Sequence, residues 1–255
     1  MFPYDSALLV AVQKVPQSVA DVLQTLQTID ATCENGDGLK WFNWLYLQVT
    51  QAVETRIASG GFADPAWLAE LDVQFARLYF LAATSALSND SSSSNSNSGK
   101  SSSGNSAVDC WQVLFERRDQ VSIARIQFAL AGINAHINHD LAEAIVATCE
   151  AAGTTPKRGG TQYVDYTALN TTLDGIVESA KQTLRVRLLG AALPPLSRLE
   201  DTIAAWSVRA ARESAWNNAA VLWHLRAVPE LCAAFMRSLD GLTAVGSKAL
   251  LVPVP

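Results

Sequence analysis

The sequence predicts an all-α fold, a single domain over residues 1–255 with about seven or eight helices and one disordered loop. The period-two alternation of apolar and polar residues that marks half-buried strands is not sustained anywhere. Ala, Leu, Gln, Glu and Arg, which favour helix, dominate the long segments. Hydrophobic residues make up 49% and charged residues 17% of the chain. So few charged residues indicate helices that are packed on more than one side.

Capping residues and turns divide the first part of the chain into three helices. Ser18 is suited to cap a helix over 18–33. A second helix is expected over 39–58, because two glycines follow it at positions 60 and 61. Asp64 and Pro65 have the order of an N-cap and a first-turn proline, and they open a helix over 64–87.

Residues 88–106 are nearly all Ser, Asn and Gly, and they predict a disordered loop inserted into the domain. A short helix follows over 109–118. The next helix, over 122–152, is expected to be central, because apolar residues leave it little solvent face.

Three further helices complete the prediction. Asp165 is a candidate cap for a helix that continues to about Leu189. The order Ser-Arg-Leu-Glu from Ser197 is a capping-box pattern, and it opens a helix to about Arg226. A last helix is expected over 229–239.

Charge and composition exclude several classes of partner. The formal net charge is −5 and the pI about 5.2, so the chain has no basic field to hold nucleic acid or anionic lipid. No apolar run reaches the roughly 18 residues of a membrane span, and no signal-peptide pattern opens the sequence. The four scattered cysteines have no C-x-x-C pair and are expected to be reduced. We therefore expect a cytoplasmic protein that does not insert into membranes; a homo-oligomer is compatible with the sequence.

The segment Ala131-Gly-Ile-Asn-Ala-His-Ile-Asn-His-Asp-Leu141 carries the strongest functional signal. On a helix, His136, His139 and Asp140 fall on one face. Imidazoles one turn apart can share a divalent metal ion, while Asp140 can act as a ligand or orient a histidine. Asn134 offers a further hydrogen bond close to them. The alternative is a polar seam in which these side chains satisfy one another between packed helices.

A metal or catalytic site at this face needs groups from other helices. Asp72 and Asp64 are candidates to complete it or to act as a base.

Aromatic and basic residues suggest how a substrate could be held. Clustered rings can form the wall of an apolar pocket, and arginines can bind a carboxylate or phosphate. At helical spacing, rings are more often core, and arginines more often form salt bridges. The candidate substrate-binding residues are Trp41, Trp44, Tyr46, Arg209, Arg212 and Trp216.

Three blocks, Trp41–Thr50, Phe62–Leu68 with Leu71–Val73, and Ile126–Leu141, carry a resemblance to a known family. They look like the blocks of an uncharacterised bacterial family with some fungal members, known only as a domain of unknown function. The resemblance covers most of the chain outside the serine-rich insertion, which departs from the shorter bacterial pattern. It implies a helical fold and no particular activity.

These observations leave three functions open. The first is a metal-dependent enzyme of the hydrolase or lyase class, which acts on a small, largely apolar metabolite by hydrolysis or elimination, with His136 and His139 as ligands. The second is a metal-free cyclase or isomerase of specialised metabolism, in which His136 or Asp140 moves a proton inside an aromatic-lined pocket. The third is a non-catalytic module that binds a hydrophobic ligand.

Overall fold

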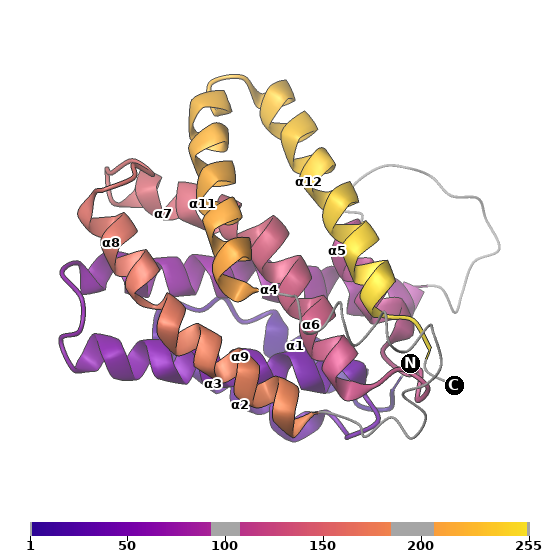
Figure 1. Ribbon diagram of the computed structural model, residues 1–255. Coiled ribbons are helices and arrows are strands. Elements are labelled where there is room, and N and C mark those ends of the chain that lie inside the picture. The colour runs from indigo at the N-terminus through magenta and orange to yellow at the C-terminus, as the bar shows by residue number, and fades with distance from the viewer. Residues whose placement is uncertain (1, 93–107, 185–206, 254–255) are drawn as a thin grey trace, which may run out of the picture.

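The computed structural model describes residues 2–92, 108–184 and 207–253, and all regular structure in these ranges is helical (Figure 1). This confirms the predicted all-α fold. In chain order the elements are α1 (Asp5–Val12), α2 (Val19–Thr32), α3 (Gly38–Ala58), α4 (Pro65–Ser92), α5 (Asp109–Arg117), α6 (Arg125–Ala135), the π-helical turn η1 (His136–Asp140), α7 (Leu141–Ala151), α8 (Thr161–Ala168), α9 (Asn170–Thr183), α11 (Val208–Leu225) and α12 (Pro229–Leu250).

Side-chain caps fix the starts of the first long helices close to the predicted positions. Ser18 Oγ accepts a hydrogen bond from the backbone N–H of Asp21 at 3.2 Å, and opens α2. Asp64 Oδ1 accepts from the N–H of Trp67 at 3.1 Å at the start of α4. Helix α3 begins slightly earlier than expected, because Asp37 is its cap.

The second half of the chain differs from the prediction in two places. Asp165 does not cap a helix: it lies inside α8, and its carboxylate accepts the N–H groups of Ala63 and Asp64. Where the structure describes it, up to residue 184, the helix expected over 165–189 is instead divided between two helices, α8 and α9; residues 185–189 lie outside the described ranges. The last helix does not end near residue 239 but continues to Leu250, because Thr243, Ala244, Ser247 and Leu250 of its second half are buried.

The remaining differences concern helix ends and one short helix. The first, α1, had no sequence signal. Helix α4 continues to Ser92, so residues 88–92 of the predicted loop are helical, while its other residues, 93–106, lie outside the described ranges. The capping box at 197–200 also lies outside them, and α11 is described from Val208.

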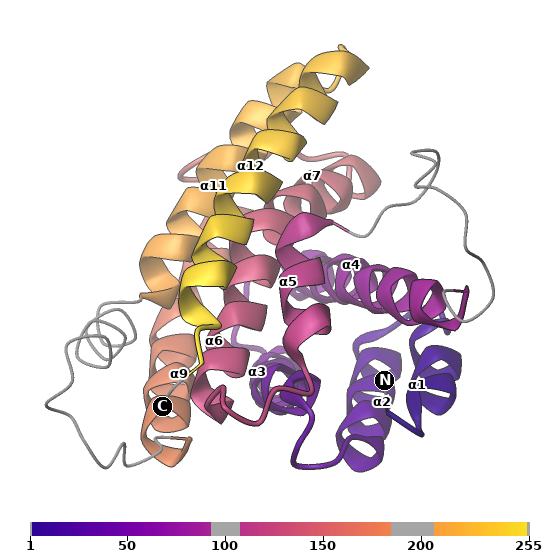
Figure 2. The same ribbon diagram turned by 90° about the vertical axis from the view of Figure 1, so that its right-hand side faces the viewer.

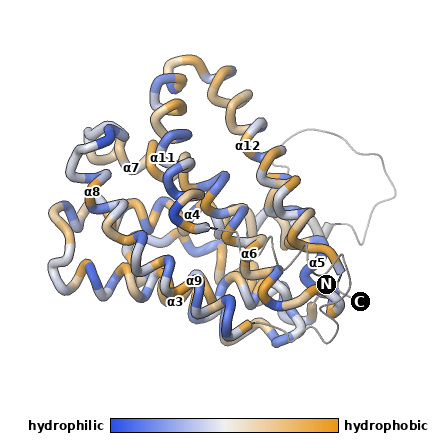
Figure 3. The backbone as a smooth tube through the Cα atoms, in the orientation of Figure 1, coloured by the Kyte–Doolittle hydropathy of each residue, from blue (hydrophilic) through white to orange (hydrophobic). Residues whose placement is uncertain are grey.

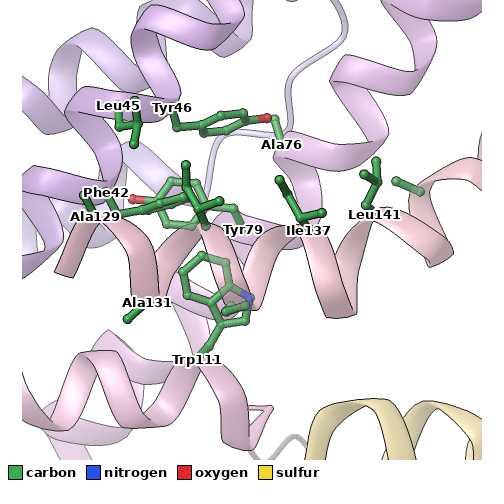
Figure 4. Close-up of a cluster of buried hydrophobic side chains, with 14 of the residues drawn as sticks. Phe42, Leu45, Tyr46, Ala76, Tyr79, Trp111, Ala129, Ala131, Ile137 and Leu141 are labelled. Atoms are coloured by element: carbon green, nitrogen blue, oxygen red, sulfur yellow. The ribbon is translucent and has the colours of Figure 1, made fainter. Parts of the chain in front are cut away.

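The segment α6–η1–α7 forms the middle of the molecule, where it contacts α3, α4, α5, α11 and α12. Gly132 permits the close approach of α6 to α3: a Cβ atom there would lie 2.3 Å from Cγ of Phe42. Phe42, Tyr46, Tyr79 and Trp111 gather beside this crossing (Figure 4). The central helix is therefore surrounded by aromatic rings at the turn that carries the histidines.

Helices α11 and α12 form a hairpin whose tip stands beyond the other helices in both views (Figure 1, Figure 2). Apolar residues continue along α12 through this projecting part (Figure 3), and Leu231 and Leu242 are 51% and 73% exposed. No helix in the described ranges is both long enough and apolar enough to cross a membrane.

Candidate active site

The site is organised around the carboxylate of Asp140, which is 3% exposed. Trp111 Nε1 donates a hydrogen bond to Oδ2 at 2.9 Å, and His136 Nδ1 lies 2.9 Å from the same oxygen. His139 Nδ1 lies 2.7 Å from Oδ1. Because an ionised carboxylate only accepts, each imidazole donates its Nδ1–H to Asp140 and keeps Nε2 available.

A local change of helix type brings these groups together. Residues His136–Asp140 form a π-helical turn between α6 and α7, and such turns occur often at functional sites. Within it, His136 reaches the carboxylate four residues later, while His139 contacts the carboxylate of its neighbour. The structure therefore brings together the three residues that the sequence pattern selected, with Asp140 in the orienting position.

Aromatic rings enclose His136. Its imidazole is stacked on Phe75, with ring centroids 3.4 Å apart and an interplanar angle of 4°. Tyr46 meets it edge-on with centroids 4.7 Å apart, and Phe42 does so at 5.7 Å. Among the described residues, His136 Nε2 has no hydrogen-bond partner.

The pKa values of the two histidines are shifted in opposite directions. Burial lowers the pKa of His136, although its hydrogen bond to Asp140 acts in the opposite sense. For His139, burial also acts to lower the pKa, but the hydrogen bond and the charge of Asp140 outweigh it, so the pKa is raised. Burial would raise the pKa of Asp140, yet its hydrogen bonds with His136 and His139 keep that pKa below its ordinary value. Such divergence is typical of a site with separate acid and base groups.

Asp72 lies on α4, one turn before Phe75, and is 7% exposed. Its Oδ2 has no hydrogen-bond partner among the described residues. Burial, together with the charge of Glu54, raises the pKa of Asp72 to about 7.

The other two predicted catalytic residues have structural contacts. Asn134 Nδ2 donates to the carbonyl oxygen of Thr243 at 2.9 Å and to Ser247 Oγ at 3.1 Å, and so joins α6 to α12. Asp64 caps α4 and also accepts a hydrogen bond from Gln162.

Of the six predicted substrate-binding residues, Tyr46 alone has a ring contact with His136 in the described structure. Trp41 packs under the guanidinium of Arg125 at 4.4 Å, while Trp44 is half-buried against the core. Arg209 is exposed and pairs with Asp174 at 2.8 Å.

Arg212 and Trp216 form a second cluster around Tyr166. The Arg212 guanidinium lies 3.8 Å from the centre of the Tyr166 ring, and its Nε donates to Asn170 Oδ1 at 2.9 Å. Trp216 packs against the same ring with centroids 4.9 Å apart. These contacts join α8, α9 and α11.

No three or more His, Cys, Asp or Glu side chains in the described ranges are grouped so that they could hold a metal ion. Both oxygens of Asp140 already accept hydrogen bonds, which suits this carboxylate better to orienting an imidazole than to binding a cation.

Sequence reasoning missed two residues of the site, Trp111 and Phe75. Trp111 is 29 positions from Asp140, and no spacing rule connects residues on separate helices at that distance. Phe75 has helical spacing within α4, which predicts burial but not the ring against which it stacks.

Comparisons with curated proteins and with solved structures gave no match. One family model matches residues 19–253, which is most of the chain and includes every residue of the site. The model is described as a family of unknown function, DUF5995, and to that family the chain belongs.

Proposed function

We propose that this protein is an enzyme that moves a proton on a small, largely apolar metabolite, as an isomerase or cyclase does, without a metal ion. The observation that carries the proposal is the pair of imidazoles held by one buried carboxylate. A histidine whose Nδ1–H is fixed by a carboxylate presents Nε2 in a defined direction, as a general base or acid requires.

The surroundings of His136 support a reaction on an apolar substrate. Aromatic rings enclose it, and its Nε2 faces no protein acceptor or donor among the described residues. His136 is the candidate base. His139, on the other oxygen of Asp140, is the candidate acid. Asp140 touches neither reacting atom in this scheme and is a positioning residue.

Exchange of carbon-bound hydrogen in heavy water tests the proposal without knowledge of the substrate. A panel of small apolar ketones, aldehydes and alkenes is incubated with the protein, and mass spectrometry detects deuterium in each compound. We expect incorporation into at least one compound with the wild type, and a loss of about a hundredfold or more in His136→Gln. His224→Gln, which changes the one histidine outside the cluster, is the matched control and should behave as the wild type.

No incorporation into any compound, or equal incorporation in His136→Gln, would contradict the proposal. The first result would favour a module that binds a hydrophobic ligand without reaction.

A metal-dependent hydrolase or lyase is the second candidate, and one observation favours it. A carboxylate that accepts Nδ1–H while Nε2 is available is also the usual support of a metal-bound histidine. Elemental analysis of untagged protein, beside the His136→Ala/His139→Ala double variant, decides between the two. Stoichiometric metal that is lost in the variant would replace the proton-transfer proposal with this one.

A further inference from the structure

Four buried polar atoms between α3, α4 and η1 have no hydrogen bond of good geometry with another described residue: Tyr46 Oη, Thr50 Oγ1, Asp72 Oδ2 and His136 Nε2. The hydroxyls of Tyr46 and Thr50 are nevertheless close enough for Thr50 to act on the pKa of Tyr46 as a hydrogen-bond partner. All four side chains are more than nine-tenths buried. A buried polar group without a partner destabilises the folded state, so such groups normally bind ordered water or a ligand when no protein group is available.

These residues occupy neighbouring turns of α3 and α4 beside η1, and we call their succession from His136 through Tyr46 and Thr50 to Asp72 the line. Tyr46 and Thr50 are one turn apart on the same face of α3. The Tyr46 hydroxyl points toward Ala76 (Figure 4), which lies one turn after Asp72 on α4. The negative charge of Asp72 also acts on Tyr46 and contributes to raising the pKa of its hydroxyl, after the larger effect of burial.

The two ends of this line differ in exposure. At one end the Tyr46 ring contacts His136, with centroids 4.7 Å apart. At the other end Asp72 is close enough to Glu54 for the charge of Glu54 to raise the pKa of Asp72, and Glu54 is half-buried. The line therefore runs from an enclosed imidazole toward the surface at the second half of α3.

We infer that ordered water joins Asp72, Thr50 and Tyr46 into a path that carries protons between solvent near Glu54 and Nε2 of His136. A proton on Nε2 passes to the nearest water or hydroxyl oxygen. Each hydroxyl or water accepts one proton and releases another, and Asp72 passes the last one to solvent. The Nε2 lone pair is restored and no group along the path changes its net protonation.

The charged and titratable neighbours fit this assignment. Glu54 and Tyr46 of α3 face Asp72, and Asp140 holds the other side of the His136 ring. Tyr79 provides a contrast: its hydroxyl is also buried and unpartnered in the described structure, but after burial the groups that act on its pKa are Cys33, Asp37 and Arg118, and Asp72 is not among them. The Tyr79 ring contacts Tyr46 and His136, but its hydroxyl points to the side opposite the Tyr46 hydroxyl (Figure 4).

The use of the path in a reaction rests on the proposed function, but the path itself can be tested without a substrate. Nitrogen NMR of the His136 side chain, recorded as the pH is lowered until the ring takes up a second proton, measures how fast the proton on Nε2 exchanges with solvent. Tyr46→Phe removes one hydroxyl and keeps the ring. We expect exchange at His136 to slow by about tenfold or more. A purely structural role for Tyr46 predicts the opposite sign, because a loosened core speeds exchange.

Tyr79→Phe is the matched control, since it removes an equally buried hydroxyl that lies off the path, and exchange should stay at the wild-type rate. Asp72→Asn is the second test, and it should also slow exchange. Unchanged or faster exchange at His136 in both Tyr46→Phe and Asp72→Asn would overturn the inference. Slowed exchange without deuterium incorporation into any compound would keep the path and remove the proposed reaction.

Discussion

At the scale of single residues, Asp140 is the group on which the site depends, and its third hydrogen bond gives the cleanest stability test. Trp111→Phe removes the Nε1–H donor but keeps an aromatic ring. We expect the free energy of unfolding to fall by about 1–3 kcal/mol more than ring contraction alone explains, because a buried carboxylate loses a donor.

Trp216→Phe is the matched control for that loss. Both indoles are fully buried, but Trp216 Nε1 has no partner in the described structure. Denaturant unfolding of the two variants should show the larger loss for Trp111→Phe; equal losses would mean that the Trp111–Asp140 hydrogen bond contributes nothing.

The raised pKa of Asp72 predicts how the free energy of unfolding depends on pH. Its pKa is raised from 3.8 to about 7 in the folded protein. The folded state therefore keeps a proton that the unfolded chain has already lost between about pH 4 and 7. The contribution of Asp72 to the free energy of unfolding is therefore complete below about pH 4. It decreases as the pH rises to 7, by a total on the order of 4 kcal/mol.

Asp72→Asn cannot ionise and should remove this part of the pH dependence. Chemical denaturation at several pH values, beside the wild type, measures the slope. An unchanged slope between pH 4 and 7 in the variant would show that Asp72 is ionised in the folded protein.

The sequence could predict that the side chains of the two histidines and Asp140 lie close together, because these residues fall within five consecutive positions. It could not supply Trp111 or Phe75, whose contacts with the site depend on how separate helices pack. For Asp64, the capping position was correctly predicted. The same carboxylate was also a catalytic candidate, because the sequence does not show that its oxygens already accept hydrogen bonds from Trp67 and Gln162.

At the scale of elements, the crossing of α6 and α3 depends on a glycine. Gly132→Ala would place a Cβ atom 2.3 Å from Phe42, so we expect destabilisation on the order of 1–3 kcal/mol from overpacking. The gain in helix propensity is smaller than this cost.

Gly175→Ala in α9 is the control with the opposite expected sign. No atom lies within 4 Å of the added Cβ, so the change should stabilise the protein by roughly 0.5–1 kcal/mol. Thermal unfolding of both variants checks the pair, and a stabilising Gly132→Ala would contradict the close packing at this crossing.

The elements also show where sequence patterns are insufficient. Apolar spacing predicted a helix over 122–152, but periodicity gives no signal for the π-helical turn within it. The turn shifts the register of the following helix, and with it the positions of His139 and Asp140. Asp165 was mistaken for a cap because an aspartate before a helical pattern has the same appearance whether it caps its own helix or binds the N–H groups of a distant loop.

At the scale of the whole molecule, the first half of α12 projects with the tip of the α11–α12 hairpin, while its second half packs on the core. We expect the two halves to differ in local stability. All buried residues of α12 lie between Thr243 and Leu250. Amide hydrogen exchange should therefore be faster over 229–240 than over 243–250, because fewer apolar contacts protect the projecting part. Equal protection at all protein concentrations would contradict the exposure of this half; protection that grows with concentration would indicate self-association.

Taken as one molecule, the fold places Asp140 at its centre and two imidazoles on that carboxylate. The tautomers of these imidazoles test the central claim most directly, and nitrogen NMR of the histidine side chains reports them. The account predicts that His136 carries its proton on Nδ1 with Nε2 unprotonated at neutral pH, and that Asp140→Asn abolishes this preference. A His136 ring protonated on Nε2, with Nδ1 bare, would contradict it.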